Sequence, residues 1–166
     1  MNQSPYYRAV KADPKVVQDL QVGCGLLATL AEQYRVDAAQ LEAIDLDFLA
    51  HKFYPKWHQK LEHHIHEFLE AIIAFGGEPA YLVGQMSGGG DVRALLTREC
   101  VTATNAFGTM CVARKNAWNA RADYVPDLWE HAIHAVQKQI ETMERELELI
   151  KQLGAAGYVS ARLENG

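Results

Sequence analysis

The sequence has few of the features that mark membrane, secreted or nucleic-acid-binding proteins. No apolar run approaches the roughly 20 residues that a membrane-spanning helix needs, and the first residues lack the apolar stretch of a signal peptide. The three cysteines stand at no metal-binding spacing, which favours a reduced, cytoplasmic chain. Acids and bases are interspersed, with a formal net charge of −5 and no basic block. We therefore expect neither a membrane nor a nucleic acid as the main partner.

Strict alternation of apolar and polar residues, the pattern of a strand, is also missing, and helical periodicity takes its place. The first helical segment opens at Asp13-Pro14, a good N-cap followed by proline, and continues through Tyr34. The second carries its apolar positions from Leu61 to Ile73 and ends at Gly76-Gly77. Proline is unfavourable inside a helix, so this segment either begins near Pro55 or is kinked there.

Two further helices and a short terminal one complete the predicted organisation. Asp91 caps a third helix that reaches Ala117, and a fourth follows from Trp129 and stops at Gly154. Residues 158–163 can form one or two further turns, and residues 76–90 make the one long connection. The sequence thus predicts an all-α bundle over residues 13–166, preceded by an N-terminal extension of residues 1–12.

Four stretches of the sequence carry a family likeness: residues 13–17, residues 62–79 ending in Phe-Gly-Gly-Glu-Pro, Gly-Gly-Asp-Val at 89–92, and residues 144–163. They are the clearest parts of a resemblance to the bacterioferritin family that extends from residue 13 to about residue 164, nearly the whole chain. It implies a ferritin-like four-helix bundle, with a long crossover between the second and third helices and a short fifth helix at the C-terminus. Because the fifth helix lines the four-fold axis of a 24-subunit shell in that family, the resemblance also implies such a shell.

Members of that family oxidise Fe(II) at a di-iron centre, and this chain departs from the ligand pattern. The centre takes a carboxylate from each of two helices and a Glu-x-x-His pair from each of the other two. No Glu-x-x-His occurs here, and the matching positions are Leu27, Leu61, His64, Ala103, Val136 and Gln139. We therefore expect no ferroxidase activity. The methionine that ligates haem in the family is replaced by Glu62, so the resemblance does not extend to a methionine-ligated haem.

Histidines are concentrated in one segment, with five of the seven between residues 51 and 66. Helical spacing places Glu62 beside His66, and His63 beside Glu67. Imidazole and carboxylate together can ligate a divalent metal, so Glu62, His63 and His66 form a candidate surface metal site. The alternative is an ordinary polar face, with His64 pointing inward as a satisfied core residue.

The resemblance also implies which side chains face the cavity of a shell. They are Lys56, Lys60, Glu67, Glu141 and Glu144. The two lysines repel cations, whereas the glutamates could help to nucleate an iron mineral. Glu99 is a separate case, a single carboxylate on the core-facing side of the third helix, and we expect it to bond a buried tyrosine such as Tyr34.

The leading functional hypothesis is a non-catalytic cage subunit for iron storage, self-assembled or mixed with a ferroxidase-competent bacterioferritin subunit. A second hypothesis keeps the cage or bundle but gives it another metal, haem, or an anionic or organic cargo. A third is an enzyme with a rebuilt site near His64 and Glu99.

Overall fold

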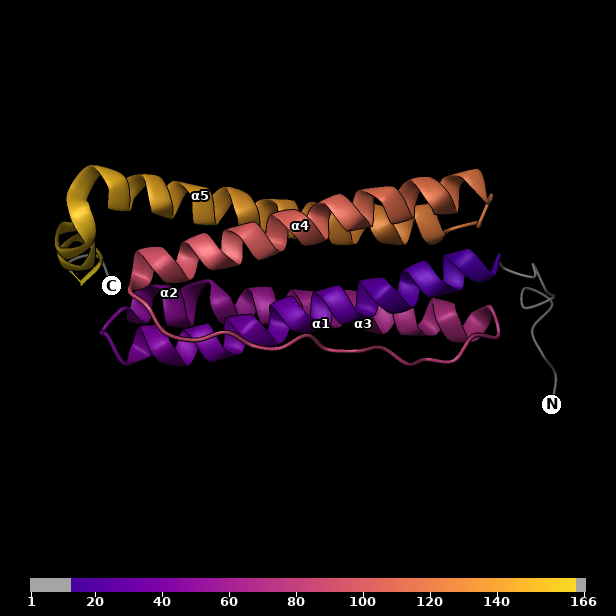
Figure 1. Cartoon of the computed structure of the whole chain (residues 1–166), viewed down its shortest axis with the longest axis horizontal. Helices are drawn as coiled ribbons and strands as arrows, with labels where there is room; N and C mark the ends of the chain where they lie inside the picture. Colours follow the sequence, from indigo (N-terminus) through magenta and orange to yellow (C-terminus); the bar gives the residue numbers. More distant parts are fainter. Residues whose placement is uncertain (1–12, 164–166) are drawn as a thin grey trace.

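The computed structural model describes residues 13–163, and these form a bundle of helices without strands (Figure 1). The N-terminal extension predicted for residues 1–12 lies outside the described residues, as do residues 164–166. The helices are α1 (Pro14–Glu42), α2 (Asp47–Lys52), α3 (Tyr54–Ala74), α4 (Val92–Asn119) and α5 (Val125–Leu163). The prediction of an all-α bundle is confirmed. The short α2 was not predicted.

Local signals in the sequence fix where the helices begin. The Asp13 carboxylate accepts from the Lys15 backbone N–H at 2.9 Å, and Asp91 accepts from the Ala94 N–H at 2.9 Å. These bonds satisfy N–H groups that the first turn of a helix leaves free. Pro55 lies in the first turn of α3, where its missing N–H breaks no helical bond. The helix therefore begins there and is not kinked by the proline.

A sharp change of direction at Gly154 separates the long part of α5 from a short terminal helix. Gly154 has φ +70°, in the left-handed region that glycine adopts readily. Beyond it the chain folds back, Tyr158 is buried, and its hydroxyl donates to Glu146 at 2.5 Å. Arg162 bonds the same carboxylate and lies 4.6 Å from the centre of the Phe48 ring. The terminal helix is thus fixed to the end of its own bundle.

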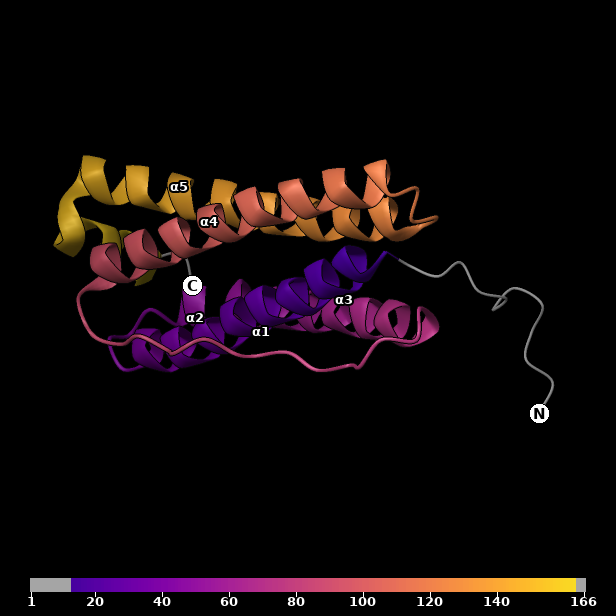
Figure 2. The same ribbon diagram turned by 45° about the vertical axis from the view of Figure 1, so that its right-hand side comes forward.

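The connection between α3 and α4, residues 75–91, runs beside α1 along most of its length (Figures 1 and 2). Gln21 donates to the Glu78 carbonyl at 2.8 Å, and the Gln33 side chain both donates to and accepts from the Ser87 backbone at 2.7 and 2.9 Å. Residue numbers rise together on both partners, so the connection runs in the direction of α1. It returns the chain to the end where α3 started, and α3 and α4 therefore run the same way.

The core fills the space between the four long helices. Trp129 is buried against Phe68, with ring centroids 4.5 Å apart, and it approaches Gly23 so closely that a Cβ there would meet the indole ring at 2.4 Å. Trp118, by contrast, is 73% exposed. None of the helices within residues 13–163 is both long and apolar enough to cross a membrane.

Candidate functional site in the bundle interior

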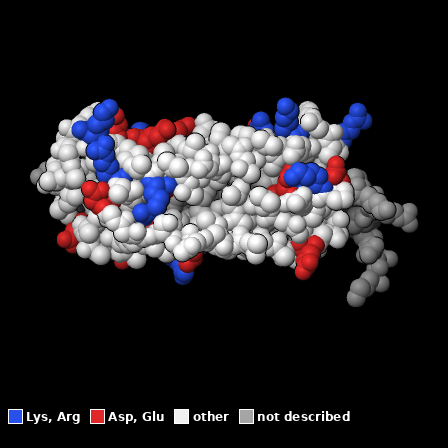
Figure 3. Space-filling model, in the orientation of Figure 1, with Lys and Arg blue, Asp and Glu red and all other residues white. Residues whose placement is uncertain are grey.

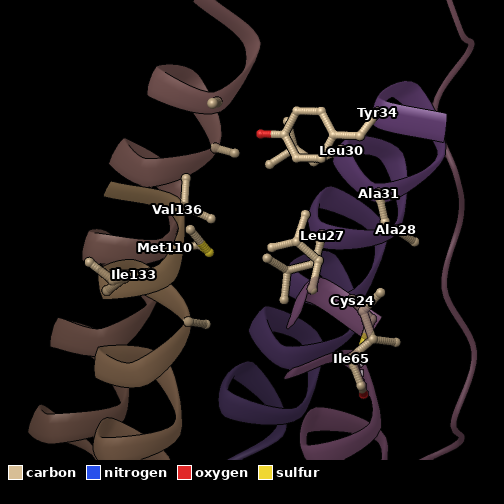
Figure 4. Packing of buried hydrophobic residues seen from close by; sticks show 14 of the residues in the cluster. Cys24, Leu27, Ala28, Leu30, Ala31, Tyr34, Ile65, Met110, Ile133 and Val136 are labelled. Atoms are coloured by element: carbon tan, nitrogen blue, oxygen red, sulfur yellow. Dashed lines mark hydrogen bonds between the residues drawn. The ribbon is translucent and has the colours of Figure 1, made fainter. Parts of the chain in front are cut away.

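The middle of the bundle is hydrocarbon at four of the six positions where the family resemblance implied metal ligands. Four side chains, one from each long helix, are 0% exposed: Leu27, Leu61, Ala103 and Val136. In Figure 4, Leu27 and Val136 face one another across the interior, with Met110 and Ile133 nearby. These residues pack as a continuous apolar layer.

The residues present do not fit a di-iron centre. A ferrous pair taken out of water needs several carboxylate oxygens to neutralise it, and the middle layer supplies none. The two polar side chains at the former ligand positions, His64 and Gln139, are both buried, and neither is a carboxylate. Across residues 13–163, no group of three or more His, Cys, Asp or Glu side chains is arranged to hold a metal ion.

His64 points into the bundle and has a partner for only one of its ring nitrogens. Its Nδ1 lies 2.9 Å from Glu67 Oε2, whereas its Nε2 is buried without a partner. The other oxygen of Glu67 lies 3.5 Å from the exposed His63, so this carboxylate lies between two imidazoles. Burial lowers the pKa of His64, and Glu67 partly opposes that effect. His64 is therefore a core histidine, although only half satisfied.

The end of the bundle nearest α2 contains a buried polar cluster, which we call the tyrosine–carboxyl cluster. Tyr54 donates to Glu99, and Tyr34 donates to the Gln139 side-chain oxygen at 2.9 Å. The Tyr34 and Tyr54 rings meet edge to face at 5.5 Å, and both touch Trp57. The expected bond between Glu99 and a buried tyrosine is present, but the tyrosine is Tyr54. Tyr34 is engaged by Gln139 on α5.

Asp37 and Arg98 complete the tyrosine–carboxyl cluster. Asp37 is fully buried and accepts from Gln33 at 2.9 Å and from the Arg98 guanidinium at 3.3 Å. Burial, followed by the hydrogen bond and charge of Asp37, raises the pKa of Glu99 well above its usual range. Burial and Asp37 thus favour the protonated form of Glu99, while the Arg98 guanidinium lies against Asp37.

Sequence reasoning missed Asp37 and Arg98. A signal for Asp37 was available, because it follows Tyr34 by three residues and so lies one turn further along the buried side of α1. Arg98 had no such signal, since its contact with α1 depends on how α4 packs against it. Its guanidinium is partly exposed and also donates to the Gly89 carbonyl at 3.1 Å.

His64 and Glu99, which the sequence suggested as a rebuilt enzyme site, do not interact with each other in the described part of the chain. No hydrogen bond or ion pair joins these two residues, and each has a different partner, Glu67 for His64 and Tyr54 for Glu99. A general acid–base pair requires both groups to reach one reacting atom. The arrangement favours two separate structural roles.

The surface histidines of α3 form three separate pairs rather than one group. His58 lies 3.9 Å from Glu62, His63 lies 3.5 Å from Glu67, and His66 lies 3.2 Å from Glu70. The predicted ligands Glu62, His63 and His66 are all exposed, yet each interacts with a different residue. The structure does not bring these three side chains together.

The side chains that the resemblance assigned to a cavity lie on the surface of α3 and α5. Lys56, Lys60, Glu141 and Glu144 are exposed, and Glu67 is partly buried beside His64. Glu141 accepts from Gln137 at 3.1 Å. The two lysines, Glu141 and Glu144 are therefore accessible to solvent.

Comparisons with known proteins assign no family to this geometry. No protein-family model matches the sequence, and no curated protein matches it either. The activity of the chain must therefore be inferred from its helix order, its interior and its surface.

Proposed function

We propose that the chain is a subunit of a hollow, bacterioferritin-like shell that stores iron without oxidising it inside its own bundle. The helix order supports a ferritin-like fold, because a connection beside α1 makes α3 and α4 run in the same direction. A plain up-down bundle has short loops throughout, whereas ferritin-type bundles have one such crossover.

One observation carries the non-catalytic part of the proposal. Leu27, Leu61, Ala103 and Val136 occupy the interior positions that would have to supply carboxylates. Hydrocarbon side chains ligate no metal, and they make the layer stable without one. Iron would be cargo for this subunit, and its oxidation would take place in solution or in a ferroxidase-competent partner subunit.

The short terminal helix supports assembly into a 24-subunit shell. It is the element that lines the four-fold axis in the family that the sequence resembles. In this chain Tyr158 and Arg162 both bind Glu146, which presents the helix in one orientation at the end of the bundle. A preformed orientation lowers the entropy cost of subunit contact.

The surface suits storage more than cofactor binding. Glu141 and Glu144 are exposed on α5 and can meet hydrated iron as it mineralises, whereas Lys56 and Lys60 would restrict where cations gather. Glu62, at the position of the family's haem-ligating methionine, is an exposed carboxylate without a thioether. The residues present do not fit a methionine-ligated haem.

The proposal is tested by assembly and iron oxidation measured on the same preparations. The chain is purified alone and after co-expression with a ferroxidase-competent bacterioferritin, and light scattering reports the size of each particle. Stopped-flow absorbance then follows Fe(II) oxidation at about two iron atoms per subunit. We expect a shell in both cases. Only the mixed sample should oxidise Fe(II) faster than buffer alone does.

His64→Ala is the matched control, because His64 is the one histidine remaining at the former ligand positions. If this subunit is non-catalytic, the variant oxidises iron at the same background rate as the wild type. A rapid phase in the pure wild type that His64→Ala removes would contradict the proposal. A monomer or simple dimer at micromolar concentration would exclude the shell.

A further inference from the structure

Trp118 differs from the other two tryptophans in having no ring contact within the described part of the chain. Trp57 packs against Tyr34, and Trp129 packs against Phe68. The Trp118 ring meets no other aromatic ring there, no cation lies over it, and the residue is 73% exposed. Tryptophan is highly buried on average and is enriched where proteins bind other molecules. An indole left in solvent without a contact therefore needs an explanation.

Two grooves meet at Trp118, where α4 ends and α5 begins. Their volumes are about 640 Å³ and about 440 Å³, each large enough for a small ligand, and Trp118, Pro126 and Asp127 line both. We call the two together the Trp118 groove. Its charged residues are Arg114, Lys115, Arg121, Asp123, Asp127 and Glu130. Figure 3 shows basic side chains projecting at the end of the molecule where Figure 1 places the turn between α4 and α5.

The end of α4 concentrates positive charge around the indole, although the whole chain has a formal net charge of −5. No Asp or Glu occurs in residues 100–122, and the three basic residues of this stretch, Arg114, Lys115 and Arg121, all lie within four positions of Trp118. Residues three and four positions apart are neighbours on a helix surface. The indole is thus flanked by cations from the turns before and after it.

Arg121 has a backbone conformation that ordinarily favours glycine. Its φ is +51°, its N–H donates to the Trp118 carbonyl at 3.0 Å, and the next N–H, of Ala122, donates to the Ala117 carbonyl at 3.0 Å. This is the pattern of a helix C-terminal cap, in which glycine is the usual residue. Arginine is strained there, and backbone strain is concentrated at functional sites. The guanidinium is therefore kept beside Trp118 at some cost to stability.

The charges that remain unpaired in the Trp118 groove narrow the choice of ligand. Arg114 and Glu130 lie 3.5 Å apart and compensate one another. Two cations and two carboxylates are exposed and have no ion-pair partner among the described residues: Lys115, Arg121, Asp123 and Asp127. A purely anionic ligand would be repelled by the carboxylates, and a purely cationic one by the cations. The groove instead suits a ligand that combines a flat aromatic surface, an anionic group and hydrogen-bond donors.

We propose that the Trp118 groove binds a purine nucleotide. The base stacks on the exposed indole, and the Arg121 guanidinium and the Lys115 ammonium group bind the phosphate. The Asp123 and Asp127 carboxylates accept from ribose hydroxyls, as acidic residues do in dinucleotide sites. All of these groups belong to one chain, so the site depends neither on iron storage nor on contacts between subunits.

The test is calorimetric titration of the full chain with guanosine monophosphate (GMP), guanosine and inorganic phosphate. Trp118→Ala removes the stacking surface. Arg121→Gly removes the guanidinium and also relieves the positive φ, so a loss of binding in this variant cannot come from a weakened fold. Arg93→Ala is the matched control, because it removes the same charge from the first turn of α4. Circular dichroism gives the Tm of each variant.

We expect GMP to bind at least about tenfold more tightly than guanosine or phosphate, because only GMP carries both the base and the charge. Trp118→Ala and Arg121→Gly should each raise the Kd for GMP about tenfold or more. Arg121→Gly should do so with an equal or higher Tm, and Arg93→Ala should leave the Kd unchanged.

Four outcomes would overturn the proposal. GMP that binds no more tightly than phosphate would exclude stacking, and GMP binding that survives both variants would place the site elsewhere. Tighter binding of a short arginine peptide than of GMP would assign the groove to a basic partner. If iodide quenches the fluorescence of the wild type no more than that of Trp118→Ala, Trp118 is covered by a neighbouring subunit.

Discussion

The middle of the bundle and its α2 end are equally buried but differ in polarity. In the middle, Leu27, Leu61 and Val136 belong to one buried apolar cluster. At the α2 end, the tyrosine–carboxyl cluster places Tyr54 against Glu99 and Tyr34 against Gln139. Both regions are packed by the same four helices.

The difference shows what this bundle requires of a buried polar group. At the α2 end each carboxyl has a partner within the chain, since Asp37 bonds Gln33 and Arg98, and Glu99 accepts from Tyr54. The middle offers no Arg or Tyr partner of this kind among the described side chains. Single polar atoms lack a partner in both regions: His64 Nε2 in the middle, and Glu99 Oε1, Arg98 Nε and Gln139 Nε2 at the α2 end. A carboxylate in the middle would need a metal for compensation, because an unpaired buried charge is strongly destabilising. Leucine and valine remove that dependence.

The largest expected effect comes from placing a carboxylate in the apolar middle. Leu27→Glu should destabilise the fold by roughly 3–5 kcal/mol, because no described Lys or Arg is buried in that layer and burial lowers the pKa of its one imidazole, His64. Leu27→Met, which keeps the volume and the hydrocarbon character, should cost less than about 1.5 kcal/mol. Urea unfolding followed by circular dichroism compares the two. Equal stability of both variants would show that the middle accommodates a carboxylate after all.

Much of the fold was predictable because its signals are local. Asp13 and Asp91 cap helices with their own side chains, and Gly154 ends one by adopting a positive φ. Each of these effects involves residues within one helical turn. The missed helix α2, Asp47–Lys52, is only six residues long and has no side-chain hydrogen bond at its N-cap, so the sequence gives no strong signal for it.

The partners within the tyrosine–carboxyl cluster were not predictable in the same way. Tyr54 and Glu99 are 45 positions apart, and Tyr34 and Gln139 are 105 apart. Periodicity shows that Glu99 faces inward, but its partner depends on the register and rotation of another helix. That dependence explains why Tyr34 was expected in place of Tyr54, and why the exposed histidines of α3 could not be assigned to one site.

A smaller effect is expected at Glu99, the carboxyl of the tyrosine–carboxyl cluster whose pKa burial raises. Glu99→Ala should cost about 2–4 kcal/mol at pH 5, because it leaves a cavity and an unpaired Tyr54 hydroxyl. Glu99→Gln keeps the shape and should cost less than about 1 kcal/mol at that pH. Comparison of the two variants separates the loss of packing from the loss of a titrating group.

The pH dependence of Glu99→Gln provides the sharper measurement. The folded pKa of Glu99 is raised by burial, so the folded state binds the proton more tightly than the unfolded state, in which the carboxyl titrates near 4.5. The associated stability is complete below pH 4.5 and is lost as pH rises above it. The wild type should therefore lose stability relative to Glu99→Gln as pH rises from 5 through the raised folded pKa of Glu99. If the free energies of unfolding of the two proteins change in parallel with pH, the raised pKa of Glu99 is refuted.

The smallest expected effect is at His64, the polar residue that the apolar middle retains. His64→Leu removes the bond to Glu67 but also removes the unpaired Nε2, so the net change at pH 7.5 should stay within about 1 kcal/mol. Burial lowers the folded pKa of His64 below its ordinary value of 6.5, and the unfolded state therefore binds the proton first on acidification. The wild type should lose stability relative to His64→Leu as pH falls from 7.5 through 6.5 to 5. Thermal unfolding of both proteins across this range measures the difference in their stability. A wild type that gains stability relative to His64→Leu as the pH falls would mean that Glu67 holds His64 in its charged form.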